Sequence, residues 1–294
     1  MKTLEGLIIK GVGGLYSVET AQGVYACKAR GVFRKDGVKP LPGDRVTVAV
    51  EELSSTVAEI HQRKNSLNRP PVANIDKLVI ISGAVSPAPS TLIIDRLTAA
   101  GEKHGIEPVV TFSKSDVADV SRFVEIYRSA GFRSFAFSSV TGEGIDEFRS
   151  VFDGGVCVLT GNSGAGKSTL LNVLEPSLRL ETGDVSKKLG RGRHTTRAVE
   201  LFRVGGAYIA DTPGFSSLDM EGGEFISKYD LELCFPDFAP FRENCRFTGC
   251  SHTAEKGCAV LAALNEGKLQ PTRHESYVAM YNEAKAVPDW KLKS

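Results

Sequence analysis

The sequence predicts an α/β fold built on a parallel sheet, preceded by an all-β barrel and followed by a small α-helical unit that carries a cysteine and histidine cluster. Five short β-rich segments without a helical period occupy residues 1–66. Apolar strands then alternate with helical stretches through residues 67–223, as in βαβ units with parallel strands. Three cysteines and a histidine gather within fourteen residues of the last unit, residues 224–294. We therefore expect three domains with these boundaries.

The first unit is predicted to be an OB-fold. Its β-rich segments are separated by glycine- and proline-containing turns, and they are Leu4–Lys10, Leu15–Thr20, Val24–Ala29, Arg45–Val50 and Thr56–Ile60. A small β-sandwich or an SH3-like barrel would have the same strand spacing. Ten basic against seven acidic side chains give the unit a mild positive charge, which favours a nucleic-acid surface.

A linker is expected at residues 65–74, because Pro70 and Pro71 interrupt regular structure. The expected strands of the second unit are Lys77–Ser82, Pro108–Phe112, Ser134–Ser138, Val156–Thr160, Val199–Val204 and Ala207–Ala210, and its helices include Leu92–Lys103 and Ser121–Ala130. The last unit is rich in phenylalanine and irregular until a closing helix at His274–Val287.

The composition excludes several classes of protein. Lys and Arg number 36 against 35 Asp and Glu, so the chain is neither a polycation nor an acidic disordered protein. Apolar runs such as Leu78–Ile81 are too short to span a bilayer, and the amino terminus lacks the charged and then apolar tract of a signal peptide. Six cysteines in 294 residues do not make a disulfide scaffold. We expect a soluble cytoplasmic monomer with no membrane partner.

The strongest motif is G-x-x-x-x-G-K-[ST], which follows an apolar strand and opens a helix that runs through Leu174. Glycine-loop N–H groups and the positive end of the helix bind phosphates in such P-loops. We expect Lys167 to reach the β- and γ-phosphates and Ser168 to hold Mg²⁺. The nucleotide-binding residues predicted here are Gly161, Asn162, Ser163, Gly164, Ala165, Gly166, Lys167, Ser168 and Thr169.

Three shorter motifs accompany the P-loop. Asp211–Gly214 has the form D-x-x-G, a loop that senses the γ-phosphate, with Asp211 acting through the Mg²⁺ shell and the Gly214 amide facing the phosphate. Ser113, Lys114, Ser115 and Asp116 resemble the N-K-x-D element of GTPases, and Ser138 and Ser139 resemble their S-A-x element. The Asp116 carboxylate can accept hydrogen bonds from guanine N1 and N2, and adenine offers no such pair of donors.

The order of these motifs differs from that of ordinary GTPases, which begin with the P-loop and end with N-K-x-D and S-A-x. Here the order is Ser113–Asp116, Ser138-Ser139, Gly161–Thr169, Thr195-Thr196 and Asp211–Gly214, which is a circular permutation joined near residues 140–155. With a barrel before it and a Cys/His cluster after it, the chain resembles the ribosome small-subunit-dependent GTPase A family over essentially its whole length.

The resemblance implies a circularly permuted P-loop GTPase that assists late maturation of the small (30S) ribosomal subunit. It implies binding of GTP/GDP with Mg²⁺, contact with 16S rRNA through the barrel and the C-terminal unit, and hydrolysis stimulated by the subunit. Residues 186–197, with five Lys/Arg and no acid, would be switch I, where Thr195 or Thr196 reaches Mg²⁺ and the γ-phosphate.

The catalytic residues expected from this resemblance are Lys167, His194 and Thr196. Phe215 stands where a catalytic glutamine is usual, so His194 would position the attacking water. Alternatively, His194 contacts phosphate or RNA, or is solvated. Ser113 stands where asparagine is usual, and we expect its shorter side chain to shorten or lose a hydrogen bond to the base or the P-loop.

Two other functions compete with this one. A P-loop small-molecule kinase or ATPase with accessory nucleic-acid-binding domains would need an acceptor-binding acid or lid arginines after the P-loop, and none is found beyond the switch-like loop at residues 186–197. A nucleotide-independent nucleic-acid module would not need Lys167 and Ser168.

The spacing Cys245-x₄-Cys250-x-His252-x₅-Cys258 predicts one structural Zn²⁺. Three thiolates and one imidazole complete a tetrahedral site with no open position. A disulfide is the alternative. The flanking aromatic residues are expected in the core rather than as RNA-stacking platforms, and they are Phe235, Phe238, Phe241 and Phe247.

Overall fold

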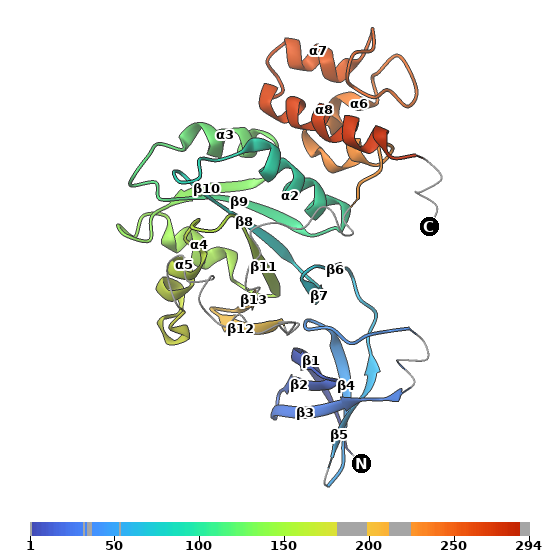
Figure 1. Cartoon of the computed structure of the whole chain (residues 1–294), viewed down its shortest axis with the longest axis vertical. Coiled ribbons are helices and arrows are strands. Elements are labelled where there is room, and N and C mark those ends of the chain that lie inside the picture. Colours follow the sequence, from blue (N-terminus) through green and yellow to red (C-terminus); the bar gives the residue numbers. More distant parts are fainter. Residues whose placement is uncertain are drawn as a thin grey trace.

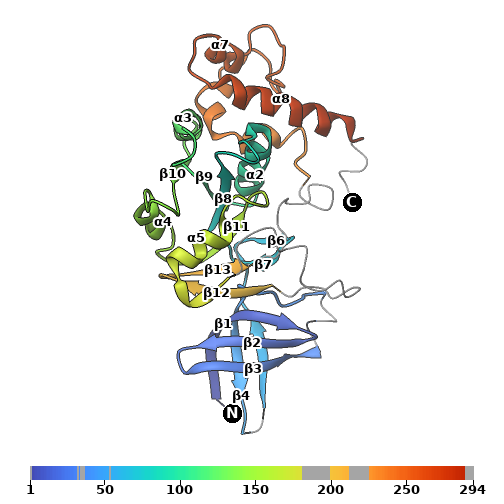
Figure 2. The ribbon, with the colours of Figure 1, turned by 60° about the vertical axis from the view of Figure 1, so that its left-hand side comes forward.

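The structure, a computed structural model, describes residues 2–31, 33, 37–52, 54–180, 199–211 and 225–288. A β-barrel lies at one end of the molecule, an α/β unit in the middle and a helical C-terminal unit at the other end (Figures 1 and 2). None of the helices in these ranges is long and apolar enough to cross a membrane.

The barrel has five strands and is closed. The strands are β1 (Lys2–Val12), β2 (Leu15–Thr20), β3 (Gly23–Ala29), β4 (Arg45–Val50) and β5 (Ser55–Ile60). Strand β1 pairs with both β2 and β4, and a parallel pairing of β3 with β5 completes the ring. Alternating apolar residues such as Ile8, Val18 and Val48 fill the interior. The predicted OB-like barrel is therefore confirmed.

The expected linker contains a short hairpin instead of irregular chain. Strands β6 (Ser66–Asn68) and β7 (Pro71–Ala73) pair antiparallel around Pro70. Leu67 and Val72 are buried in the core of the α/β unit, and this burial explains why the segment is ordered. Pro71 is tolerated because it is the first residue of its strand.

The α/β unit contains a six-stranded sheet in the order β10-β9-β8-β11-β13-β12. Its strands are β8 (Lys77–Gly83), β9 (Glu107–Ser113), β10 (Arg133–Phe137), β11 (Val156–Thr160), β12 (Glu200–Val204) and β13 (Ala207–Asp211). All neighbours are parallel except β12, which runs antiparallel to β13 at the edge. The carboxyl ends of five parallel strands therefore meet along one edge of the sheet.

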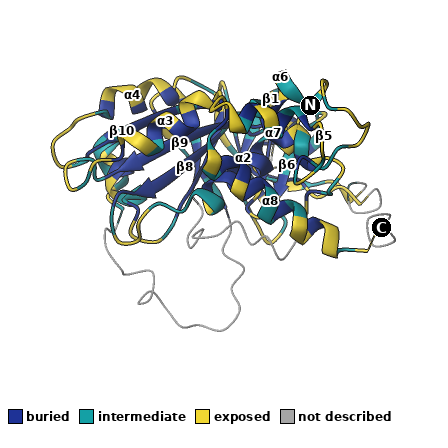
Figure 3. Ribbon diagram, turned by 90° about the horizontal axis from the view of Figure 1, so that it is seen from above, coloured by how far each residue is buried: buried dark blue, intermediate teal, exposed yellow. Residues whose placement is uncertain are grey.

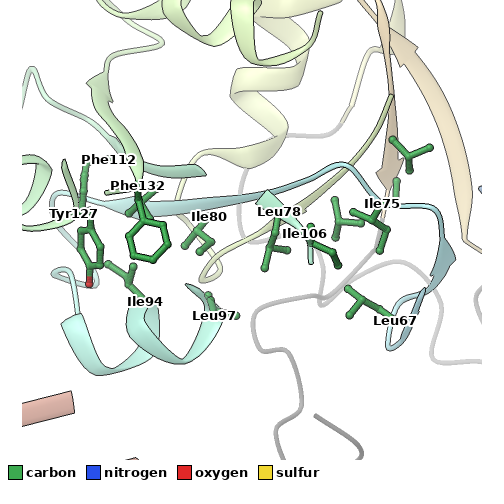
Figure 4. Close-up of a cluster of buried hydrophobic side chains, with 14 of the residues drawn as sticks. Leu67, Ile75, Leu78, Ile80, Ile94, Leu97, Ile106, Phe112, Tyr127 and Phe132 are labelled. Carbon is green, nitrogen blue, oxygen red and sulfur yellow. The ribbon is translucent and has the colours of Figure 1, made fainter. Parts of the chain in front are cut away.

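Helices cover both faces of this sheet. Helices α2 (Thr91–Lys103) and α3 (Ser121–Ser129) pack on one face, where Ile94 and Leu97 meet Leu78 and Ile80 (Figure 4). Helices α4 (Ile145–Val151) and α5 (Lys167–Leu174) pack on the other, and a short 3₁₀ helix η1 (Pro176–Leu178) follows α5. Figure 3 shows the resulting pattern, with the central strands buried and the outer helix faces exposed.

The edge strand β12 connects the sheet to the barrel. Lys10 of β1 lies opposite Glu200 of β12, and their side chains form an ion pair of 2.6 Å. Nearby, Arg203 donates both to Glu19 of β2 at 3.0 Å and to the Tyr208 hydroxyl at 2.6 Å. One sheet therefore continues from the α/β unit into the barrel.

The C-terminal unit packs on α2. It contains η3 (Leu231–Cys234), η4 (Pro236–Phe238), α6 (Ala239–Arg242), α7 (Ala259–Asn265) and α8 (Pro271–Ala286), so the closing helix starts three residues before its predicted position. Phe235 and Phe238 are fully buried, as expected. Phe247 was expected in the core, but half of it is exposed, because it lies in a loop between two cysteines.

Candidate functional site

The P-loop connects β11 to α5 and requires glycine at its turns. A side chain at Gly161, where φ is +145°, would place its Cβ 2.0 Å from the carbonyl oxygen of Ile81. Gly164 and Gly166 have φ of +77° and +84°, in the left-handed region that costs other residues about 1 kcal/mol or more. The spacing of the motif is thus set by backbone geometry.

Lys167, the first residue of α5, turns back over this loop. Its Nζ donates to the carbonyl oxygens of Gly161 at 2.5 Å and Asn162 at 2.8 Å. Burial lowers the pKa of Lys167, because the charged ammonium is partly removed from water. Phosphate oxygens at this position would offset that desolvation, which is the chemistry expected of a P-loop lysine.

Ser113, the last residue of β9, fastens the predicted base-recognition segment to the P-loop. Its buried hydroxyl donates to the carbonyl oxygen of Ala165 at 2.7 Å. The backbone N–H of Ala84 in turn donates to the carbonyl of Ser113 at 2.9 Å. The sequence predicts that the short side chain of Ser113 shortens or loses a hydrogen bond to the base or the P-loop. The hydrogen bond to the P-loop is not lost, because the end of β9 lies next to the carbonyl of Ala165.

The rest of this segment lies at the same edge of the sheet. Lys114 adopts φ of +63°, and its ammonium donates to the carbonyl of Val85 at 3.4 Å. The N–H of Ser115 donates to the carbonyl of Phe137 at 3.2 Å, which ties the segment to the end of β10. Asp116 is exposed and therefore accessible to a ligand.

Ser138 follows β10 and shapes the second predicted base-recognition turn. Its buried hydroxyl accepts hydrogen bonds from the N–H groups of Val140 and Thr141, both at 3.1 Å. Because β9 and β10 are parallel neighbours, the turn with Ser139 lies beside the Ser113–Asp116 segment. Three motifs separated in the sequence are thus gathered at the carboxyl edge, where α/β sheets bind ligands.

Asp211 ends β13, a parallel neighbour of β11, so its backbone lies at the same edge as the P-loop. The side chain of Asp211 is not described. His194, Thr195, Thr196 and Gly214 lie outside the described residues. Their predicted roles remain predictions.

The four expected metal ligands come together in the C-terminal unit. One ligand atom from each of Cys245, Cys250, His252 and Cys258 lies within 4.8 Å of all the others. The Nδ1 atom of His252 is 3.5 Å from the Cys245 sulfur and 3.4 Å from the Cys258 sulfur. All six cysteines are free, so the disulfide alternative is wrong.

The surroundings of this cluster fit a structural zinc ion. Glu232 lies 2.6 Å from Nε2 of His252, so it directs Nδ1 toward the sulfurs, as carboxylates beside zinc-bound histidines do. The N–H of Ala259 donates to the Cys245 sulfur at 3.3 Å, and that of Leu261 to the Cys258 sulfur at 3.4 Å. Such donors stabilise thiolates, and four protein ligands leave no open position.

Two contributors to this site were not found from the sequence. Glu232 is twenty residues before His252, and His274, whose Nε2 donates to the carbonyl of His252 at 2.8 Å, is 22 residues after it. Neither has a recognisable spacing, so only the packing of η3 and α8 against the ligand loop identifies them.

The fold and sequence match a known family. Residues 60–221 match the family described as RsgA GTPase, and residues 5–57 match the one described as RsgA N-terminal domain. The chain is 44% identical over 288 residues to a small ribosomal subunit biogenesis GTPase RsgA of Geobacillus thermodenitrificans, and the match covers 96% of this chain and 97% of that protein. A protein with the same description from Caldanaerobacter subterraneus is 41% identical over 290 residues, 97% of each chain.

Two solved structures are similar to this chain over nearly its whole length. YloQ, described as a circularly permuted GTPase, is 33% identical with a TM-score of 0.81, covering 98% of this chain and 97% of its own. YjeQ from Thermotoga maritima is 30% identical with a TM-score of 0.83, and the match covers 98% of this chain and 100% of that protein. The predicted circular permutation is thereby confirmed, and the kinase alternative has no support. From its motif order, its sheet order and these matches, we conclude that the chain belongs to the RsgA GTPase family.

Proposed function

We propose that this chain hydrolyses GTP and acts, as a cytoplasmic monomer, in maturation of the small ribosomal subunit, whose 16S rRNA it binds. The relatives described as biogenesis GTPases support this function. The observation that carries it is the 2.7 Å hydrogen bond from Ser113 to Ala165, which connects the segment expected to recognise guanine with the loop expected to bind phosphates.

The nucleotide is held by the residues of the predicted motifs. The P-loop amides and the Lys167 ammonium neutralise the β- and γ-phosphates, and the Asp116 carboxylate accepts guanine N1–H and N2–H. Ser139 and the turn shaped by Ser138 lie against the base. Mg²⁺, held by Ser168 and Thr196 when bound, supplies charge neutralisation at the phosphates.

Hydrolysis is assigned to switch I. His194 orients the attacking water, and Thr196 senses the γ-phosphate. The basic residues of 186–197 meet rRNA phosphates, which explains why the subunit stimulates hydrolysis. The Cys₃His cluster holds one structural Zn²⁺ that shapes the C-terminal unit.

The test is single-turnover hydrolysis of GTP and of ATP, with and without purified small subunits. We expect the unaltered chain to prefer GTP and to be stimulated strongly by subunits, less so at higher salt. Lys167→Ala should lose nucleotide affinity and activity, and His194→Ala should bind GTP normally without stimulation. Lys268→Ala, in an exposed pair with Glu266, is the matched control.

Each result addresses one assignment. Equal hydrolysis by the Lys167→Ala variant would remove the P-loop assignment. Stimulation that survives in His194→Ala would remove the histidine from the mechanism, and the absence of any stimulation would remove the subunit as the partner.

A further inference from the structure

The loop between the ligands Cys245 and Cys250 presents one aromatic side chain to solvent. Phe247 is 51% exposed. The other exposed large apolar side chains in the described part of the C-terminal unit are Phe225, Tyr229 and Leu233, and all three precede the metal-ligand loop. The neighbouring aromatic residues Phe235, Phe238 and Tyr277 are buried. An exposed ring in a loop fixed at both ends by metal ligands is a candidate contact for a partner.

Arg246 is positioned over this ring. Its backbone N–H donates to the carbonyl of Gly257 at 3.0 Å, so the first ligand loop is tied to the residue before Cys258. The carbons of its side chain lie 3.0–3.7 Å from the place that a Cβ on Gly257 would occupy, which shows that the stem lies flat on that glycine. The guanidinium carbon is 5.4 Å from the centre of the Phe247 ring.

The guanidinium therefore stands over one face of the Phe247 ring, while half of the Phe247 residue stays exposed. No ion pair of Arg246 occurs within the described part of the chain, so its charge is not neutralised by a carboxylate there. The basic side chains nearby in the sequence are Arg242 and the exposed Lys256. The acidic side chains of residues 242–256 are Glu243 and Glu255. Glu255 accepts from the N–H groups of Ser251 and Thr253, so this carboxylate is directed into its own loop.

We propose that Arg246 and Phe247 form a stacking site for an unpaired base of small-subunit rRNA. This rests on the proposed function. Bases stack on aromatic rings in single-stranded segments, and an adjacent arginine reaches the backbone phosphate. A protein partner would be expected to need a broader apolar patch than one ring beside Thr248 and Gly249. The C-terminal unit lies at the end of the molecule opposite the barrel, so the barrel does not cover this loop (Figure 2).

The experiment measures the affinity of the zinc-loaded full chain for purified small subunits in the presence of a non-hydrolysable GTP analogue. Stacking on an aromatic ring contributes about 1–3 kcal/mol per base, so Phe247→Ala should weaken binding roughly 5- to 160-fold. Phe247→Tyr should bind normally and Phe247→Leu should not, because a tyrosine keeps the π-face. Arg246→Ala should weaken binding and reduce its salt dependence. Leu233→Ala, which removes another exposed apolar side chain of the same unit, is the control.

The zinc content and unfolding midpoint of each variant establish that the loop is intact. Unchanged affinity of an intact Phe247→Ala variant would overturn the stacking site while leaving the proposed function in place. Normal binding by Phe247→Leu would indicate apolar contact with a ribosomal protein and would also overturn it. If the unaltered chain fails to bind subunits, the proposed function itself fails, and the stacking site with it.

Discussion

Arg273 of α8 and Asp95 of α2 form an ion pair of 2.8 Å in which both side chains are completely buried. Arg273 also donates to Asp237 at 2.7 Å, and its guanidinium carbon lies 4.6 Å from the centre of the Phe235 ring. Burial acts to lower the pKa of Arg273, but the charges of Asp237 and Asp95 raise it above its usual value. One charged group therefore joins the C-terminal unit to the α/β unit.

We expect Arg273→Ala to lower the free energy of unfolding by about 3–5 kcal/mol, because it leaves two carboxylates buried without their partner. Urea denaturation of the zinc-loaded chain measures this loss. Lys268→Ala, which removes an exposed ion pair, should change the same quantity by less than about 1 kcal/mol. Equal effects would show that the buried pair does not join the two units.

Ser113→Ala should weaken binding of GDP and GTP equally, by roughly fivefold, because it removes one hydrogen bond worth about 1 kcal/mol and leaves the Ala165 carbonyl unpaired. Fluorescent-nucleotide titration measures this change. Ser129→Ala is the matched control, since that hydroxyl donates to the Ile126 carbonyl at 3.0 Å on α3, outside the site. An unchanged Kd for Ser113→Ala would show that this bond does not support the P-loop.

Asp116→Asn should shift base preference from guanine toward xanthine, since the C2 oxygen of xanthine can accept from an amide. Affinity for GTP should fall by roughly 100-fold, as two charge-assisted hydrogen bonds are lost. Competition between GTP and xanthosine triphosphate measures the switch. The exposed Asp119, whose carboxylate accepts from Ser121, provides the control Asp119→Asn. Unaltered selectivity would place Asp116 away from the base.

Metal analysis of reduced protein should find one Zn²⁺ per chain, and Cys250→Ser should lose it with local unfolding of the C-terminal unit. Glu232→Ala should keep the fold but lower zinc affinity by about 10- to 100-fold, because His252 loses its orienting carboxylate. Titration against a chelator measures the zinc affinity of each variant. The control is Glu243→Gln, which changes an exposed acid of the same unit. Equal affinity for the two variants would remove Glu232 from the metal site.

The contact between barrel and sheet should depend on pH through Glu19. Partial burial acts to raise the pKa of Glu19, but hydrogen bonds from Tyr208 and Arg203 outweigh it and lower the pKa below 4.5. The stabilisation is therefore present above that value and lost as the pH falls through the lower, folded-state pKa. Glu19→Gln should cost at most about 1 kcal/mol at pH 7, with the difference from the unaltered chain shrinking in acid. A difference that persists in strong acid would exclude this linkage.

Much of this protein can be predicted from local sequence patterns, because they have local physical causes. The P-loop glycines are required by positive φ and by the close approach of Ile81, and a strand before the loop and a helix after it follow from apolar periodicity. The four metal ligands lie within fourteen residues, so their chemistry is also local. The motif order predicts the circular permutation without knowledge of any contact.

Other features were decided only by tertiary structure. The hydrogen bond from Ser113 to Ala165 depends on how closely β9 approaches the P-loop, and the ordered hairpin around Pro70 depends on the burial of Leu67. Glu232 meets His252 only because η3 packs against the ligand loop. The exposure of Phe247 follows from a turn between two ligands, since apolar character alone does not determine which phenylalanine the core can hold. The sequence by itself determined the elements and the local sites, whereas packing between distant segments decided which side chains support them.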